Sequence, residues 1–462
     1  MKVYNTMTRT KEDFVPLTAG SVGMYVCGVT VYDLSHIGHA RSAVAFDVMR
    51  RYLAFKGFRV TFVRNYTDID DKIIRRANES GVSAREISER YIAAEREDMA
   101  SLGLLPPDIE PKATEHIPEM VALIERLITL GVAYVVDGDV YFEIRRFPRY
   151  GRLSGKNLDE LLAGARVDVD ERKRDPRDFA MWKAAKPGEP SWPSPWGAGR
   201  PGWHIECSAM AMRYLGESFD VHGGGEDLIF PHHECEIAQA EAATGRPFSR
   251  YWLHNGFVNM AKEKMSKSLG NTLSIRDLVK RFDPDALRLF FLGTHYRNPL
   301  EWSEERVQES ARALERFRRL LDDPNAANAE PSASARPDGF RGQFESAMDD
   351  DFNTPQALGV LFDLARSLND GRERAHVDAM ARTAFAAGVA ELRLLGGVLG
   401  LFARRATVQG PSPEVERLVA ERVAARKARD FRRSDELRER IATLGFLVED
   451  TPAGPRLTRK DS

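Results

Sequence analysis

Two short segments, far apart in the chain, carry residues suited to binding the phosphates of a nucleotide. The first is the tetrapeptide HIGH (His36–His39), which follows a predicted buried strand and opens a predicted helix. Free backbone N–H groups and the helix dipole make such a turn a phosphate site, and Gly38 admits close approach of a nucleotide. His36 and His39 can donate hydrogen bonds to phosphate oxygens. Taken alone, the tetrapeptide fits an ordinary surface loop equally well.

The second segment is KMSKS (Lys264–Ser268). Its two lysines, Lys264 and Lys267, are suited to stabilising the charge that develops on a departing pyrophosphate, in a loop mobile enough to close over it. Loops with lysine and serine are common on protein surfaces, so this motif is also weak by itself. The two literal motifs in one chain are far less expected by chance, and together they indicate a site for the phosphates of a nucleotide.

A third group of residues has the chemistry of a metal site. Cys27 ends the first predicted strand, Cys207 lies in the segment GWHIECS, and the segment PHHECE opens a predicted helix at its proline. That helix places His232 and Glu236 on one face. Two thiolates, an imidazole and a carboxylate suit tetrahedral zinc if neighbouring strands and loops bring them together. Because no CxxC pair is present, buried free cysteine stays open as the competing interpretation, and Cys235 is expected to point elsewhere on its helix.

Alternating strands and helices are needed to position these residues. Met24–Val31 and Arg59–Asn65 have the composition of buried strands, and His39–Lys56 between them has apolar residues at helical spacing. This order predicts an α/β fold with a Rossmann-type parallel sheet, in which ligands bind at the carboxyl ends of the strands. The proline- and glycine-rich run 187–202 predicts a boundary or flap. From Ile275 onward the pattern becomes helical.

The length of 462 residues corresponds to about three domains at ~150 residues each. A run of Pro, Ala, Ser and Asn at 322–338 predicts a linker, and Phe344–Leu368 and Val377–Leu401 predict two long helices of a bundle. We therefore expect a catalytic domain split by an insertion, then a junction, a helical bundle and a small C-terminal domain. The expected bounds are 1–120 with 200–262, 121–199, 263–320, 341–405 and 411–462.

Composition excludes several classes of protein. The chain has 67 Lys and Arg against 69 Asp and Glu, so it is not a globally basic nucleic-acid binder. A local basic stretch, Arg422–Arg433, has six basic residues and one acidic residue, with Phe431 as a stacking surface; a solvated helix face is the competing interpretation. Three cysteines cannot form a disulfide framework, and no apolar run of about 18 residues occurs, so we expect a cytoplasmic protein outside the membrane.

With these motifs assembled, the chain resembles the bacterial cysteinyl-tRNA synthetases, a family of class I aminoacyl-tRNA synthetases whose signature is the pair HIGH and KMSKS. The resemblance covers nearly the whole chain. Further motifs that carry it are CGVTVYD from Cys27, NYTDIDDK from Asn65, HGGGED from His222 and DDDFNTP from Asp349. In that family zinc is held by residues that match Cys27, Cys207, His232 and Glu236, the same set that ligand chemistry suggests.

The resemblance implies an enzyme that activates L-cysteine with ATP to cysteinyl-adenylate and transfers it to the 3′ end of tRNA(Cys). One zinc ion per chain would select the thiol over the hydroxyl of serine, so that no editing domain is needed. Magnesium would accompany ATP. By the same resemblance His36, Gly38, His39 and Lys267 bind ATP, and His36, His39, Lys264 and Lys267 are catalytic.

The resemblance also assigns the remaining sites. The cysteine pocket would be formed by Gly28, Thr67, Trp203 and His222, with Asp227 as partner of the ammonium group. Positions that read the anticodon in the family match Arg426, Phe431, Asp435 and Asp450. The chain departs from the family at Leu457, where a tryptophan is usual. By analogy with the family we expect a monomer.

Three other functions stay open at this point. A ligase that joins cysteine to a small amino sugar, as in mycothiol synthesis, shares the catalytic half but lacks an anticodon-binding end. A zinc-dependent RNA-binding protein without catalysis would leave HIGH and KMSKS unexplained. The resemblance also implies a persulfide-forming side activity, linked in the family to the region of Lys72 and to the KMSKS lysines, but the segment KIIRR from Lys72 differs from the lysine-rich form of the family.

Overall fold

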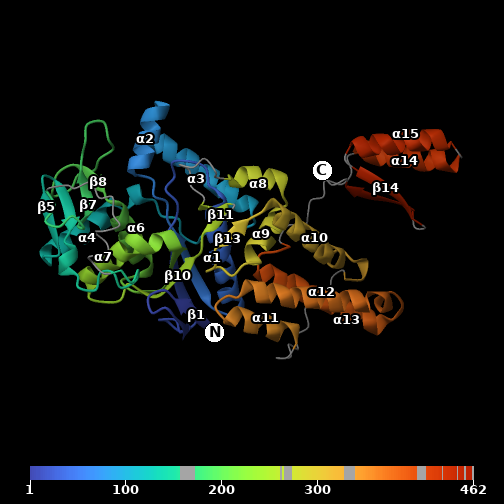
Figure 1. The fold of residues 1–462 in the computed structure, drawn as a ribbon, viewed down its shortest axis with the longest axis horizontal. Coiled ribbons are helices and arrows are strands. Elements are labelled where there is room, and N and C mark those ends of the chain that lie inside the picture. Colours follow the sequence, from blue (N-terminus) through green and yellow to red (C-terminus); the bar gives the residue numbers. More distant parts are fainter. Residues whose placement is uncertain are drawn as a thin grey trace. The chain divides into compact units, whose positions relative to one another are not determined.

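The computed structural model describes residues 1–156, 172–260, 263–264, 273–326, 339–402, 413–428, 430–444, 446–451 and 454–459. The chain divides into two compact units, Met1–Phe402 and Ala403–Ser462. Figure 1 shows the course of the chain through both.

A four-stranded parallel sheet lies at the centre of the first unit, with strand order β10-β9-β3-β4. Its strands are β3 (Ser21–Val26), β4 (Arg59–Arg64), β9 (Phe219–Gly225) and β10 (Ser249–Asn255). Helix α1 (Ile37–Phe55) connects β3 to β4 as the crossover that parallel strands require. The predicted α/β class with a parallel sheet is therefore confirmed, although β3 starts and ends earlier than the expected Met24–Val31.

The two faces of this sheet are covered by different helices (Figure 1). Along β3, Met24 and Val26 pack with residues of α1, whereas Tyr25 faces the opposite side, where it packs with α6 (Trp203–Leu215) and α7 (Glu234–Thr244). This alternation follows from the period of two along a strand. Residues at the carboxyl end of the sheet can therefore meet partners from both faces.

The segment of chain between β4 and β9 forms a separate antiparallel sheet. Helix α4 (Ile117–Thr129) leads into β5 (Ala133–Val136), β6 (Asp139–Phe142), β7 (Phe179–Ala184) and β8 (Gly199–Pro201), which lie in that order. The proline- and glycine-rich run ends in β8, an edge strand, which is the position in a sheet that tolerates proline.

The other elements of the first unit lie before the central sheet in the chain, between its strands or after them. Two strands form an N-terminal hairpin, and three short strands form a small sheet of order β12-β11-β13. The bounds are β1 (Lys2–Asn5), β2 (Thr10–Asp13), α2 (Asp71–Ser80), α3 (Ala84–Ser101), β11 (Val258–Met260), β12 (Glu263–Lys264), α8 (Ile275–Arg281), α9 (Pro284–Leu292), β13 (Leu300–Trp302) and α10 (Glu304–Leu321).

The helical bundle differs from the sequence expectation in one respect. The predicted helix Phe344–Leu368 is two helices, α11 (Phe340–Asp349) and α12 (Thr354–Val377), followed by α13 (Ala379–Val398). Between them Asp351 and Phe352 have φ values of 63° and 52° in the left-handed region. The Asp351 carboxylate holds this turn by accepting hydrogen bonds from the Tyr4 backbone and the Tyr296 hydroxyl, both at 2.8 Å. These partners lie far away in sequence, so helical periodicity could not reveal the break.

The second unit contains two helices and a β-hairpin. They are α14 (Pro413–Lys427), α15 (Phe431–Thr443), β14 (Phe446–Thr451) and β15 (Gly454–Arg459). A small apolar core formed by Val415, Leu418, Leu437, Ile441 and Val448 holds them together. Among the helices of the described ranges, none is long and apolar enough to cross a membrane.

Candidate active site

A cavity of about 480 Å³ opens at the carboxyl end of the central sheet, where ligands bind in folds of this class. The loops after β3, β4, β9 and β10 and the first turns of α1 and α6 form its walls. Ten residues predicted from the sequence line it: Cys27, Gly28, His36, Gly38, His39, Thr67, Trp203, Cys207, Asp227 and His232. Segments that are distant in the chain thus meet in one cavity.

Four of the predicted ligands form a cluster at one side of this cavity. One donor atom from each of Cys27, Cys207, His232 and Glu236 lies within 4.8 Å of the others. His232 Nε2 is 3.0 Å from Glu236 Oε1, and the Cys27 Sγ is 3.5 Å from the same oxygen. Cys207, His232 and Glu236 are buried, whereas Cys27 is half-buried at the cavity wall.

The elements that carry the cluster differ in two ways from the sequence expectation. Cys207 lies on helix α6 and not on a strand or loop. Helix α7 begins at Glu234, after a separate helical turn η4 (Ile229–His233), so the proline of PHHECE does not open it. His232 and Glu236 nevertheless remain on one face, because the turn leads directly into the helix.

Neighbouring side chains hold the donors in place. His204 Nδ1 lies 2.9 Å from His232 Nδ1, which leaves His232 Nε2 facing the cluster, and the Trp203 ring stacks on His232 at 4.3 Å between ring centroids. His222 Nε2 is 2.8 Å from Glu236 Oε2, the carboxylate oxygen that does not contact His232. The sequence interpretation missed His204. Its spacing from Cys207 would have placed both on one face if the segment had been treated as helical.

A second set of four donors overlaps the first. Cys27, His222, His233 and Glu236 also lie within 4.8 Å of one another. The first set contains two sulfur donors, and its imidazole is already oriented by His204, as ligating histidines usually are by a second hydrogen bond. We therefore take Cys27, Cys207, His232 and Glu236 as the better fit to a metal ion. The side chain of Cys235 points away from this set and lies 3.2 Å from the Tyr150 hydroxyl.

The electrostatics of the cluster are compatible with a bound cation. Burial raises the pKa of the Cys27 thiol, to which Cys207 and Glu236 add, and burial also raises the pKa of Cys207. Burial lowers the pKa of His232, so its imidazole is neutral. Several acceptor groups packed together out of water are stabilised in their deprotonated, metal-ligating forms only by a positive charge among them. The residues present therefore fit a divalent metal ion.

The predicted cysteine pocket is partly formed around the cluster. A Cβ at Gly28 would lie 1.6 Å from the Asn65 carbonyl oxygen, so only glycine fits there. Thr67 Oγ1 donates to Glu206 Oε2 at 3.0 Å, and the Asp227 side chain lies exposed at the mouth. His222 is fully buried behind Glu236 and does not line the cavity.

The HIGH tetrapeptide lies at the start of α1, as predicted. His36 caps the helix, because its Nδ1 accepts a hydrogen bond from Gly38 N at 3.1 Å, and the His36 and His39 rings stack at 3.8 Å. The Ile37 N–H donates to the Leu273 carbonyl at 2.9 Å. Lys264, the first residue of KMSKS, lies in β12 beside the cavity strand β11, and Leu273, five residues after the motif, contacts HIGH. Lys267 and the Lys264 side chain lie outside the described residues.

The residues predicted to read an anticodon lie on the second unit. Arg426 is exposed on α14, and Asp435 is exposed on α15. Phe431, the first residue of α15, is 61% exposed, which is unusual for a phenylalanine without a partner surface. The side chain of Asp450 is outside the described residues. Within the basic stretch Arg422 is buried, so that stretch is not uniformly a solvated face.

Comparison with known proteins first identifies the class. Residues 13–312 match the family model "tRNA synthetases class I (C) catalytic domain", and residues 343–403 match a DALR domain. Methionyl-tRNA synthetase of Mycobacterium tuberculosis, solved with methionyl-adenylate, has a similar fold with a TM-score of 0.60 at 15% identity, covering 82% of this chain and 90% of that one. The fold and the paired motifs are those of a class I aminoacyl-tRNA synthetase.

The particular family follows from the full-length relatives. Residues 409–454 match the "Cysteinyl-tRNA ligase anticodon binding domain". The cysteine–tRNA ligase of Geobacter sulfurreducens is 52% identical and that of Trichlorobacter lovleyi 54% identical, each over 98% of this chain and 98% of the relative. The chain belongs to the cysteinyl-tRNA ligase family, and the resemblance inferred from its motifs is confirmed.

Proposed function

We propose that the chain activates L-cysteine with ATP to cysteinyl-adenylate and transfers it to the 3′ end of tRNA(Cys), with one zinc ion selecting the thiol. The observation that carries this proposal is the cluster of two thiols, an imidazole and a carboxylate in the wall of the cavity that HIGH also lines. Full-length similarity to cysteine–tRNA ligases supports the same reaction.

Cys27, Cys207, His232 and Glu236 would hold the zinc ion, because this donor set has the number and softness that zinc prefers. Bound there, zinc would accept the substrate thiolate as a further ligand and would not accept the hydroxyl of serine, which is a poor ligand and stays protonated. His222 and His204 orient Glu236 and His232 through the hydrogen bonds described above. We therefore assign His222 a role through Glu236 and not direct contact with substrate.

The amino acid would lie between the cluster and α1. Asp227 would pair with its ammonium group, and Gly28, Thr67 and Trp203 would enclose the remainder. Glu206 holds the hydroxyl of Thr67 in a fixed orientation, which favours one position of the substrate backbone.

ATP would bind against the amino end of α1 with its magnesium ion. Binding there would exchange the bond between His36 Nδ1 and Gly38 N for bonds to phosphate oxygens. His36 and His39 would contact the phosphates, while Lys264 and Lys267 would stabilise the departing pyrophosphate. Losing one such contact typically costs ~3 kcal/mol in the transition state.

The acceptor would be tRNA and not an amino sugar, because the chain carries a match to an anticodon-binding domain over 409–454. Arg426, Phe431, Asp435 and Asp450 would contact the anticodon.

We propose that residues 1–120 with 200–262 form the catalytic domain, with the insertion, junction, bundle and C-terminal domain bounded as expected from the sequence. The enzyme would work as a monomer in the reducing cytoplasm, where its ligand thiols stay available.

Cysteine-dependent exchange of pyrophosphate into ATP, measured without tRNA, tests the first half of this reaction. We expect exchange with cysteine and at most ~10⁻⁴ of that efficiency with serine, because the site is built around a group that serine lacks. Absence of exchange with cysteine, or comparable exchange with serine, would contradict the proposal.

A further inference from the structure

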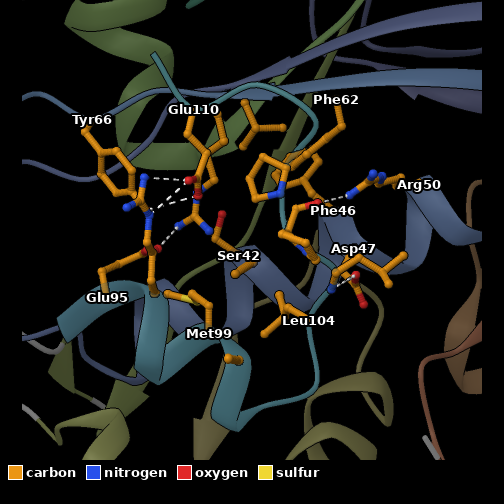
Figure 2. A pocket seen from close by; sticks show the side chains of 18 residues that line it. Ser42, Phe46, Asp47, Arg50, Phe62, Tyr66, Glu95, Met99, Leu104 and Glu110 are labelled. Carbon is orange, nitrogen blue, oxygen red and sulfur yellow. Dashed lines mark hydrogen bonds and ion pairs between the residues drawn. The ribbon is translucent and has the colours of Figure 1, made fainter. Parts of the chain in front are cut away.

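Arg64 lies at the boundary between two cavities. It is the last residue of β4 and pairs in register with Val26 on β3, so both lie on the sheet face that α1 covers. Its side chain lines the active-site cavity and also a second, largely apolar cavity of about 270 Å³ between α1, β4 and α3, which Figure 2 shows. Asn65, the next residue, accepts a hydrogen bond from the Gly28 N–H at 2.9 Å through its side-chain Oδ1.

The charge of Arg64 is unusual for its position. Its side chain is 14% exposed, and among the described residues that line the active-site cavity only Arg64 and Lys72 carry a permanent positive charge. Within the described ranges its one ion-pair partner is Glu95, at 3.3 Å from Nη2. An enclosed guanidinium with a single acidic partner at this distance retains capacity for a second anion.

A buried network keeps the Arg64 partner in place. Glu95 is 4% exposed, and its Oε2 accepts a hydrogen bond from the Tyr66 hydroxyl at 2.8 Å. The same hydroxyl lies 3.2 Å from Glu110, which pairs with Arg96 at 2.8 Å. In Figure 2 Tyr66, Glu95 and Glu110 converge at one end of the second cavity. Arg64 is therefore held by a rigid partner and not by a mobile surface carboxylate.

The groups expected to bind the thiol of cysteine and those expected to lie near its carboxylate come from opposite faces of the sheet. The thiol-binding cluster draws Cys207 and Glu236 from α6 and α7 on one face, whereas HIGH starts α1 on the other. On the proposed function, the carboxylate of cysteine must point away from the cluster and toward α1 to attack the α-phosphate of ATP. Arg64 reaches the cavity from that side.

We propose that Arg64 binds the α-carboxylate of cysteine and holds it in line for attack on ATP, and that Glu95 positions Arg64. A guanidinium presents a planar pair of donors that matches a carboxylate, and an oriented pair favours a near-attack geometry. This inference rests on the proposed function and adds a residue that recognises the end of the substrate opposite the thiol.

Binding of cysteine and of cysteamine to the zinc-loaded enzyme tests this assignment. Cysteamine has the thiol and the amine but lacks the carboxylate. By calorimetry without ATP, we expect Arg64→Gln to raise the Kd for cysteine about tenfold and to change the Kd for cysteamine less than about twofold. Glu95→Gln should raise the Kd for cysteine by a smaller factor, again without affecting cysteamine.

Arg50→Gln is the matched control. The Arg50 side chain is 14% exposed, like that of Arg64, but Arg50 pairs with Asp108 and lines only the second cavity, so its loss should leave both affinities unchanged. Zinc content near one per chain in all variants shows that they fold. Equal effects of Arg64→Gln on both ligands, or none on cysteine, would overturn the assignment. If the wild-type chain shows no cysteine-dependent pyrophosphate exchange, the proposed function is contradicted. If the wild type is active and the Arg64→Gln variant catalyses exchange equally well, only the role of Arg64 is overturned.

Discussion

Cys207 is a buried member of the proposed metal cluster. It is 1% exposed, and its sulfur lies 3.7 Å from Asn65 Oδ1, among residues from three elements. Because burial raises the pKa of this thiol, its deprotonated form depends on the charge of a bound metal ion. Cys207 therefore separates the metal hypothesis from that of an ordinary core cysteine.

We predict that Cys207→Ser loses stoichiometric zinc and affinity for cysteine but retains ATP binding, because HIGH lies on the opposite face of the sheet. Metal analysis and equilibrium binding of ATP check both parts. Cys235→Ala is the control, since Cys235 is equally buried and lies one residue from Glu236 but outside the cluster. One zinc per chain in the Cys207→Ser protein would contradict the ligand assignment.

Residue types revealed the candidate ligands, but their supporting partners could not be read from the sequence. Cys27, His232 and the HIGH histidines stand out because such residues are chemically distinctive next to predicted strand ends and helix starts. Glu206 and Arg64 were missed, since their importance comes from contacts with Thr67 and Glu95, which only the fold brings near.

Among the elements, α1 is anchored to the following helices by buried arginines. Asp47 on α1 forms a buried ion pair with Arg288 on α9. The Arg288 Nε also donates a hydrogen bond at 2.7 Å to the carbonyl of Leu399, the residue that follows α13. Arg41, two residues after HIGH, donates to the Asn298 carbonyl at 2.8 Å. These bonds fix the helix that carries the proposed phosphate-binding end.

We predict that Asp47→Asn lowers the free energy of unfolding by about 3–5 kcal/mol, because it leaves the Arg288 charge buried without its partner. Burial alone would raise the pKa of Asp47, but Arg288 and Arg51 outweigh it and lower the pKa. A carboxylate whose pKa is lowered by folding contributes fully to the free energy of unfolding above its pKa in the unfolded chain, ~3.9. This contribution is lost as the pH falls through its pKa in the folded protein. The difference between the two proteins should therefore shrink below about pH 4.

Urea denaturation at several pH values measures this difference. Asp363→Asn provides the comparison, because Asp363 pairs with Arg366 on the exposed surface of α12 and its loss should cost less than ~0.5 kcal/mol. Equal costs for the two substitutions would mean that the Asp47 pair does not anchor α1.

Two of the four strands of the central sheet, and the helix between them, were predicted, whereas helix boundaries elsewhere were not. The run His39–Lys56 between two apolar strands has few alternatives to a parallel βαβ unit, and the structure contains it. The GWHIECS segment carries no comparable signal, because Gly202 and a proline-rich run precede it. Its helix is held by burial of Ile205 and Met210 against the insertion, a contact that local sequence does not encode.

For the whole molecule, the two units divide the reaction into steps that can be measured separately. The first unit contains the complete cavity, and the second carries the exposed Phe431. The near-neutral net charge of the chain conceals this division, because the basic residues of the second unit are balanced elsewhere.

We predict that Phe431→Ala raises the KM for tRNA(Cys) about tenfold without changing cysteine-dependent pyrophosphate exchange, because stacking of a base on an aromatic ring contributes ~1–3 kcal/mol. Phe431→Tyr keeps the ring and should restore the KM. Steady-state charging and exchange, measured on the same preparations, check both statements. An unchanged KM in the alanine variant would show that this ring does not contact tRNA.

The decisive experiment for the proposed reaction is charging of tRNA(Cys) by the zinc-loaded enzyme, with cysteine and serine supplied at equal concentration. We predict cysteinyl-tRNA as the product, with seryl-tRNA below detection, because only a thiol can complete the metal site. Failure to charge tRNA(Cys), or serine transfer at a comparable rate, would contradict it.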